Sequence, residues 1–339
     1  MALHPSRGAD RQQLDEPARG RGRREQQVEM RVLITGAAGF FGRALVRAFA
    51  LGGEHVVAAD ILPPGDFAPR SDTPSDRLEY VVLDVADPDA WSTDVTGEVD
   101  AIVHAAALTP SIQETKEDPS KLVSVNLTGT LNAMEFARSQ NMGKFLFISS
   151  AGVYNQFDEV TLTEADADGG FSLYGSAKLA AEIMLFRYAD MFGFDAGAIR
   201  PTSMYGPAEE FRNTRPFVTQ AKQLADAALD GVPVRVIGVD DRCDWVFVDD
   251  VAEGAHRFFS GDMDSRAFAF SSGDPIPFQD VLDAAVAAFG VVVDADAEML
   301  VDATPDRATT ISCDKARSEL GWNPMGIEEG MRRYAELGG

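Results

Sequence analysis

Short apolar stretches alternate with longer amphipathic stretches along the first 200 residues of the chain. The short stretches are apolar on both faces of an extended chain, which predicts strands buried on both sides. They lie at 31–34, 55–59, 79–83, 100–103, 144–148 and 195–199. Helical periodicity occurs near 41–51, 119–140, 174–192, 217–230, 248–260 and 278–289. This alternation predicts an α/β fold built on a doubly wound parallel sheet of the Rossmann type.

A glycine-rich turn joins the first predicted strand to the first predicted helix. It reads Thr35-Gly-Ala-Ala-Gly-Phe-Phe-Gly42. The first glycine permits a tight turn, the second lets the backbone approach a pyrophosphate, and the third lets the helix pack close to the strand. A strand before the turn and a helix after it favour a dinucleotide site over a simple helix cap. The predicted cofactor contacts in the turn are Gly36, Gly39, Phe40, Phe41 and Gly42.

An acid closes the second predicted strand. Asp60 lies about 20 residues beyond the glycines, where a carboxylate can accept hydrogen bonds from the adenosine ribose. Its charge would repel a 2′-phosphate, so the pattern predicts NAD as the cofactor rather than NADP. We include the adjacent Ile61 in this predicted site. The alternative, a solvated acid at the end of a strand, stays open at this point.

The alternation of strands and helices breaks after Arg200, where prolines become frequent. We therefore expect an NAD-binding Rossmann domain over 30–200 and a smaller C-terminal α/β substrate lobe over 201–339. Segment 241–262 is expected to pack back onto the first domain. Short strands are predicted in the second part at 234–237 and 244–248.

The first 29 residues are polar and rich in Arg and Gln. They contain no apolar segment of the kind that a secretory signal requires. We expect residues 1–29 to form a disordered lead, or an extension upstream of a natural start at Met30.

Composition narrows the class of protein. The 339 residues are 45% hydrophobic without a membrane-spanning apolar run, which indicates a soluble globular protein. A net charge of −24 repels nucleic acid and anionic lipid, so neither is an expected partner. The excess of acids suits a salt-rich cytoplasm, and equally a genome that favours Arg over Lys. Cys243, Cys313 and four scattered histidines form no disulfide or metal pattern, so we expect a cytoplasmic protein without a metal site.

Two polar motifs carry the candidate chemistry. Tyr174 and Lys178 lie one turn apart on a predicted helix face. A nearby cation and an oxidised nicotinamide both stabilise a phenolate, so we expect a working pKa of Tyr174 well below its free value. Ser149 and Ser150 end the fifth predicted strand, and one hydroxyl could hydrogen-bond a substrate hydroxyl as its proton leaves. The alternative is that both serines only cap the following turn.

Together these residues resemble the extended short-chain dehydrogenase/reductases, in particular the NAD-dependent epimerase/dehydratase family. The resemblance runs from Arg31 to about Glu336, with the motifs in the order of the family. It is specific for the family and not for a substrate. The motifs are Thr35 to Gly42, Leu83-Asp-Val85, His104-Ala-Ala-Ala107, Asn126-Leu-Thr-Gly-Thr130, Ser149-Ser150 with Val153-Tyr154, Tyr174-xxx-Lys178, Arg200-Pro201 with Tyr205-Gly206-Pro207, Val248-Asp-Asp-Val251 and Leu320-Gly-Trp322.

The resemblance implies a catalytic triad of Ser150, Tyr174 and Lys178, with Tyr174 as the acid and base. It also implies that the helices over 119–140 and 174–192 pair with a second subunit, so we expect a homodimer. The further cofactor contacts that it implies are Asp84, Val85, Ala105, Ala106, Asn126, Tyr174, Lys178 and Pro201. The implied contacts to a sugar-type substrate are Thr109, Ser150, Ser203, Arg242 and Arg307.

Departures from the family pattern narrow the reaction. Dehydratases of the family place Asp and Glu directly after the catalytic hydroxyl residue, where this chain has Ala151 and Gly152. Uronate decarboxylases place Glu at the position of Gly152, and fucose-synthase-like enzymes place Cys at that of Ala151. Neither residue here can move a proton, so we expect neither a dehydratase nor a decarboxylase. Plain hydride transfer remains.

Three functions stay open. The favoured one is a nucleotide-sugar epimerase that retains NAD. However, Ser203 stands where such epimerases commonly have Asn, and Cys243 stands directly before Asp244 where they have Arg. The alternative is therefore an NAD-dependent dehydrogenase or ketoreductase of a sugar, a sugar acid or another small hydroxy compound. A catalytically silent NAD-binding regulator is the third, and the complete triad argues against it.

Overall fold

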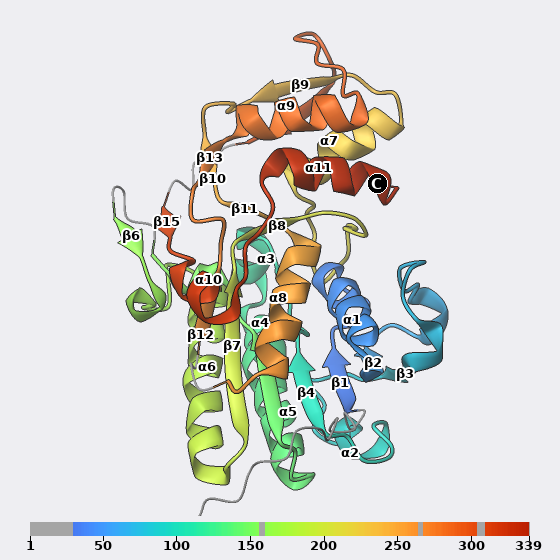
Figure 1. Ribbon diagram of the computed structural model, residues 1–339, viewed down its shortest axis with the longest axis vertical. Helices are drawn as coiled ribbons and strands as arrows, with labels where there is room; N and C mark the ends of the chain where they lie inside the picture. Colours follow the sequence, from blue (N-terminus) through green and yellow to red (C-terminus); the bar gives the residue numbers. More distant parts are fainter. Residues whose placement is uncertain (1–29, 156–159, 264–266, 304–308, 339) are drawn as a thin grey trace, which may run out of the picture.

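Seven strands form one parallel sheet at the centre of the computed structural model, which describes residues 30–155, 160–263, 267–303 and 309–338 (Figure 1). Their order is β12-β7-β5-β4-β1-β2-β3. The chain adds strands first on one side of β1 and then on the other, which confirms the predicted doubly wound sheet. The strands are β1 (Arg31–Thr35), β2 (His55–Asp60), β3 (Leu78–Val82), β4 (Ala101–His104), β5 (Lys144–Ile148), β7 (Asp195–Pro201) and β12 (Ala267–Phe270). The predicted lead lies outside the described residues.

The seventh strand, β12, is a correction to the sequence analysis, which predicts the other six. It lies in the part assigned to the second lobe, yet it pairs in parallel with β7, from Ala267 opposite Ala198 to Phe270 opposite Pro201. Its four residues are too short for a periodic signal, and its partner lies far earlier in the chain.

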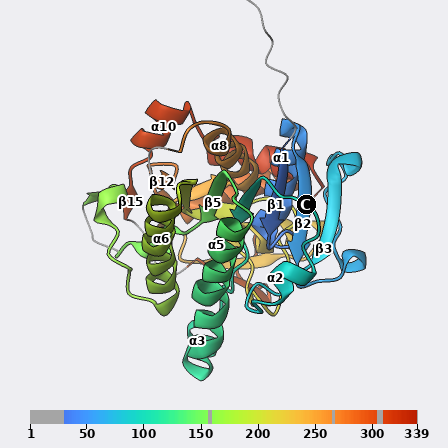
Figure 2. The ribbon, with the colours of Figure 1, turned by 90° about the horizontal axis from the view of Figure 1, so that it is seen from below.

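Helices cover both faces of the large sheet (Figures 1 and 2). Helices α1 (Phe40–Gly52) and α8 (Val248–Ser260) pack together on one face. Helices α5 (Gly129–Ser139) and α6 (Leu173–Phe192) cover the other. Both faces are therefore buried, which explains the continuous apolar strands in the sequence.

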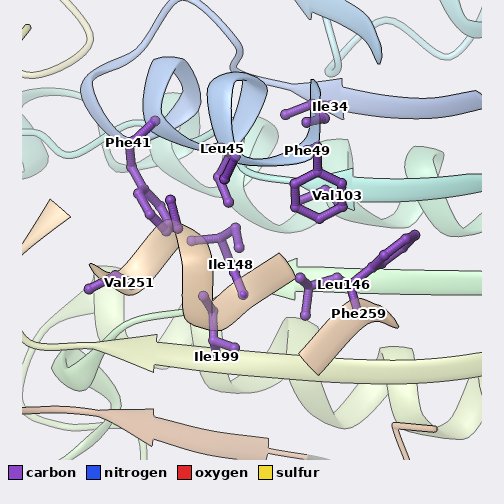
Figure 3. Packing of buried hydrophobic residues seen from close by; sticks show 14 of the residues in the cluster. Ile34, Phe41, Leu45, Phe49, Val103, Leu146, Ile148, Ile199, Val251 and Phe259 are labelled. Atoms are coloured by element: carbon purple, nitrogen blue, oxygen red, sulfur yellow. The ribbon is translucent and has the colours of Figure 1, made fainter. Parts of the chain in front are cut away.

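The side chains of each strand alternate between two cores. In β1, Val32 and Ile34 belong to the core under α1 and α8, whereas Leu33 belongs to the core under α5 and α6. Figure 3 shows the first core, where side chains of α1 and α8 meet those of the sheet. The residues labelled there are Ile34, Phe41, Leu45, Phe49, Val103, Leu146, Ile148, Ile199, Val251 and Phe259.

A smaller α/β lobe lies beyond the carboxyl ends of the sheet strands (Figure 1). Its parallel pair β9–β14 and its helices enclose a core of their own. The predicted elements at 217–230, 234–237 and 278–289 are confirmed, whereas α11 lies beyond the last predicted element. The lobe contains α7 (Gln220–Leu229), β9 (Val234–Ile237), α9 (Phe278–Phe289), β14 (Met299–Asp302) and α11 (Ile327–Glu336).

Short strand pairs and turns connect the two layers. The chain leaves for the lobe after β8 and returns through β11, and these two strands pair in parallel. The short strands are β6 (Thr161–Leu162), β8 (Ser203–Tyr205), β10 (Arg242–Cys243), β11 (Trp245–Phe247), β13 (Ile276–Pro277) and β15 (Thr310–Ile311). The short helices are α2 (Ala90–Thr93), α3 (Ile112–Glu117), α4 (Pro119–Val123) and α10 (Asp314–Leu320), with 3-10 turns at Pro64–Asp66, Ser75–Arg77, Ala151–Val153 and Glu164–Asp166.

Candidate active site

The glycine turn packs too closely for side chains. Gly36 has a φ of +68°, and a Cβ there would lie 2.7 Å from the backbone nitrogen of Ala106. A Cβ on Gly42 would lie 2.0 Å from the carbonyl oxygen of Gly36. The N-cap residue of α1, Gly39, has no side chain, so the first helix amides are left to a ligand. This cradle fits a pyrophosphate, and it lies against Ala105 and Ala106, which are also predicted to touch the cofactor.

Asp60 ties the turn to the end of β2. Its Oδ2 accepts a hydrogen bond of 3.0 Å from the backbone of Ala38, and its Oδ1 accepts one of 3.1 Å from Leu62. The carboxylate is therefore held at the mouth of a hollow beside the turn, where the adenosine of a dinucleotide belongs. The hollow is lined by Ala37, Ala58, Asp60, Leu62, Pro64, Phe67, Tyr80 and Val81.

The remaining predicted contacts near the turn differ in exposure. Ile61 and Asp84 are exposed after their strands, whereas Val85 is buried. Phe41 points into the core beside Val251, so only its backbone is available to a ligand (Figure 3).

The start of α6 brings Tyr174 to the end of β5. A Cβ on Gly175 would lie 2.0 Å from the carbonyl oxygen of Gly152, so the helix begins in direct contact with the turn after β5. Ser150 Oγ accepts a hydrogen bond of 3.0 Å from the Gly152 amide, and the Ser150 hydroxyl and the Tyr174 ring both lie beside Gly152. Ser150 therefore caps its turn on the side where the phenol lies. Sequence analysis missed Gly175, although a glycine directly after the tyrosine was a usable signal.

Lys178 is buried one turn further along α6. Its Nζ donates a hydrogen bond of 2.8 Å to the carbonyl oxygen of Ile148 and lies 5.9 Å from the centre of the Tyr174 ring. Burial lowers the pKa of Lys178 to about 7, and the charge of Glu182 opposes that shift. The cation is therefore held under the phenol by the end of β5.

The pKa of Tyr174 differs from the sequence-based expectation for the cofactor-bound enzyme. In the protein alone, burial of the hydroxyl raises this pKa, whereas the hydrogen bond with Ser150 and the positive charge of Arg215 lower it. The raised pKa arises because protein atoms surround the hydroxyl and replace the water that would solvate a phenolate. Part of the Tyr174 side chain still reaches the surface.

A buried ion pair lies one further turn along α6, and sequence analysis missed it. Arg200 at the end of β7 donates to both oxygens of Glu182, with distances of 3.0 Å from Nε to Oε1 and 2.6 Å from Nη2 to Oε2. Its Nη1 donates to the Tyr154 hydroxyl at 2.9 Å and to the Glu164 carbonyl at 2.8 Å. This network joins α6 and β7 to the segments on either side of β6.

Asn126 clamps the segment that follows β4. It lies in a π-helical turn, Ser124–Thr128, that interrupts the helix expected over 119–140. Its Oδ1 accepts from the backbone of Leu108 at 2.7 Å, and its Nδ2 donates back to Leu108 at 2.9 Å. The side chain thus positions the backbone next to Thr109.

Residues 206–219, between β8 and α7, form a loop that we call the arginine loop. It contacts α1 through Glu210, whose carboxylate accepts from Arg43 at 2.9 Å and 3.3 Å. It contacts the segment after β4 through Thr214, whose carbonyl accepts from the amide of Thr109 at 2.9 Å. Sequence analysis singled out none of the charged residues of this loop.

The predicted substrate residues fall into separate groups. Ser203 contacts Cys243, with 3.1 Å between Oγ and Sγ, and Arg242 of β10 donates to the carbonyl of Pro275. Thr109 lies instead under the arginine loop. Pro201 is buried at the end of β7, and Arg307 lies outside the described residues. The roles assigned to these residues stay predictions.

Other kinds of site were also considered. Within the described ranges, no group of three His, Cys, Asp or Glu side chains could hold a metal ion, and Cys243 and Cys313 form no disulfide with each other. No helix in the same ranges is long and apolar enough to cross a membrane.

Comparisons with known proteins find relatives that match most of the chain. A model of the NAD-dependent epimerase/dehydratase family matches residues 32–265. The chain is 29% identical over 314 residues to the UDP-glucose 4-epimerase of Mycolicibacterium smegmatis, covering 91% of this chain and 98% of the relative. It is 27% identical over 314 residues to the dTDP-glucose 4,6-dehydratase of Streptomyces antibioticus, covering 90% and 91%. The structure of the UDP-glucose 4-epimerase of Thermotoga maritima shares the fold, with a TM-score of 0.74, 23% identity and coverage of 91% and 98%.

Proposed function

This chain belongs to the NAD-dependent epimerase/dehydratase family, and from that premise we propose that it is an NAD-retaining epimerase acting at C4 of a nucleotide sugar. One observation supports the proposal above the others. Ser150 and the Tyr174 ring lie together beside Gly152, and Lys178 Nζ is 5.9 Å from the ring centre, whereas Ala151 and Gly152 after the serine carry no ionisable group. The site can move a hydride and a hydroxyl proton, but it lacks the second acid and base that an elimination needs. We therefore propose that the enzyme catalyses neither dehydration nor decarboxylation, although dehydratases are among the relatives.

The residues present fit NAD, and each proton transfer of the proposed reaction has a side chain that can carry it out. The glycine turn and Asp60 would hold the dinucleotide, which when bound supplies the acceptor and then the donor of the hydride. Tyr174 takes the proton of the C4 hydroxyl as the C4 hydrogen leaves as hydride, and returns it to the same oxygen after the keto sugar has turned its other face. Ser150 hydrogen-bonds that oxygen, and the charge of Lys178 stabilises the phenolate.

An assay without added cofactor tests this proposal. Purified enzyme should interconvert a nucleotide sugar and its C4 epimer with no added NAD and no net formation of NADH. Net reduction of added NAD in proportion to substrate would instead identify the alternative, a dehydrogenase or ketoreductase of a sugar, sugar acid or small hydroxy compound.

We expect Asp60 to set the choice of cofactor. NAD should bind at least tenfold more tightly than NADP, because repulsion between Asp60 and the 2′-phosphate is worth upwards of about 1.4 kcal/mol. The exchange Asp60→Ala should narrow this gap and weaken NAD binding, since the carboxylate also holds the Ala38 amide. Titration of the apoenzyme with both dinucleotides measures this, with the exposed Asp66→Ala as the control. Equal affinities in the unaltered enzyme would contradict the prediction.

We propose further that the protein is a cytoplasmic homodimer that pairs through α5 and α6. In support, α6 exposes large apolar side chains: Ile183 is 54% exposed, Met191 71% and Phe192 46%. Such side chains on one helix favour contact with a second copy. The mass in solution of the unaltered protein, compared with that of the Ile183→Glu variant, tests the pairing. Two cysteines that form no disulfide with each other support a reducing compartment.

A further inference from the structure

Arg215 is the residue of the arginine loop that faces the reacting site. Its guanidinium carbon lies 5.3 Å from the centre of the Phe40 ring at the start of α1 and 5.1 Å from that of Phe217. Its neighbour Thr214 accepts the hydrogen bond from Thr109. The positive charge of Arg215 also lowers the pKa of Tyr174. The guanidinium therefore lies beside the start of α1, in the loop that contacts the segment after β4, and its charge reaches the phenol.

Glu209 fixes the direction of this guanidinium. Glu209 is fully buried, and its carboxylate accepts from the amide of Thr219 at 3.0 Å and from its hydroxyl at 2.6 Å. The same carboxylate pairs with Nη1 of Arg215 at 2.5 Å. Nη1 is buried, and this ion pair is its polar contact among the described residues. No hydrogen bond joins Nε or Nη2 to another described residue, and 21% of the side chain is exposed. Two donors of an oriented guanidinium are thus left for a ligand.

We propose that these two donors of Arg215 bind a carboxylate on the sugar ring, so that the preferred substrate is a nucleotide hexuronate rather than a nucleotide of a neutral hexose. The inference rests on the proposed C4 epimerisation. The planar fork of an arginine matches a carboxylate with two parallel hydrogen bonds. The phenylalanine rings exclude water from one side of the pair, which strengthens it.

The position favours a carboxylate on the ring over the pyrophosphate of the nucleotide. In a hexuronate, the carboxylate is attached to C5, next to the reacting C4, whereas the phosphate is attached to C1 across the ring. The charge of Arg215 reaches Tyr174, the proposed base at C4, and its loop contacts Thr109, a predicted substrate residue. A chain with a net charge of −24 also repels anions in general, so an anionic sugar needs a cation held locally.

The test compares ligands that differ only in the carboxylate. We expect the holoenzyme to show at least about tenfold higher kcat/KM for UDP-glucuronate than for UDP-glucose, the effect of a charge-assisted hydrogen bond. Arg215→Met should reduce this ratio to near one, with the NAD dissociation constant unchanged. Arg212→Met removes the same charge from the same loop, where Arg212 pairs outward with Glu210, and should keep the ratio. The double variant Glu209→Gln/Arg215→Met leaves no unpaired buried acid, and should behave as Arg215→Met does.

Each other outcome has a definite meaning. Equal kcat/KM for both nucleotides in the unaltered enzyme overturns the proposal, as does a loss in Arg215→Met that is equal for both. If Arg215→Met binds NAD more weakly but keeps the ratio of kcat/KM between the two nucleotides, the arginine binds the cofactor, and the proposal is wrong. If neither nucleotide reacts, the proposed epimerase function is wrong. The affinities of the holoenzyme for D-glucuronate and for D-glucose are then compared to test the carboxylate site. A preference for the acid that Arg215→Met abolishes supports the site, and equal or absent binding overturns it.

Discussion

The exchange Tyr174→Phe is expected to lower turnover by about 10²-fold or more while leaving NAD affinity nearly unchanged. Phenylalanine keeps the ring but removes the group that accepts and returns the hydroxyl proton, a contribution that typically reaches this size. The glycine turn and Asp60 are expected to hold the dinucleotide, so the NAD affinity should hardly change.

Single-turnover kinetics with the true substrate and a titration with NAD measure these two effects. Ser150→Ala is the graded comparison, and it should do less harm because it removes a hydrogen bond to the phenol rather than the phenol itself. A Tyr174→Phe enzyme with near-normal turnover would end the assignment of the triad and the mechanism built on it. A parallel loss of NAD binding would show instead that the exchange disturbs the NAD site at the glycine turn.

The exchange Arg200→Leu should have the largest effect on stability, a loss of roughly 3–5 kcal/mol in the free energy of unfolding. It leaves the carboxylate of Glu182, which is 1% exposed, without its partner in the interior. It also leaves the buried Tyr154 hydroxyl without the donor at 2.9 Å. A buried charge that loses its partner is destabilising because no water replaces the lost hydrogen bonds.

Urea unfolding at neutral pH measures this loss. The matched control is Arg187→Leu on the same helix, whose pair with Asp190 lies at the surface at 3.6 Å and should contribute within about 1 kcal/mol. The double variant Glu182→Leu/Arg200→Leu should recover much of the loss, because it removes both charges together. Similar losses for Arg200→Leu and Arg187→Leu would show that the interior pair is not important for stability.

The parts of the candidate site that sequence analysis singled out are local in the chain. The glycine turn is read from eight consecutive residues between a strand and a helix, and the structure shows why each close contact excludes a side chain. Tyr174 and Lys178 are one helical turn apart, so their spacing alone places them on one face. Ser150 follows β5, and parallel strands end at one edge of the sheet, where ligands bind.

The parts that the sequence left undetermined depend on contacts between distant segments. The short strand β12 has no periodic signal, and its place beside β7 is decided by pairing over a long separation. The pair of Glu182 with Arg200 forms because α6 packs on the sheet beside β7.

By itself, then, the sequence determines the alternating fold, the dinucleotide turn and the spacing of the predicted triad, because each follows from the geometry of one turn, strand or helix. The tertiary structure alone decides which charged residues face the site. Arg215 and Arg212 lie in one loop and look alike in the sequence, yet only Arg215 lies over Phe40 with Glu209 buried beside it. The lowered pKa of Tyr174 that is expected with NAD bound stays a prediction. In the protein alone, burial raises this pKa, because protein atoms from several elements surround the hydroxyl.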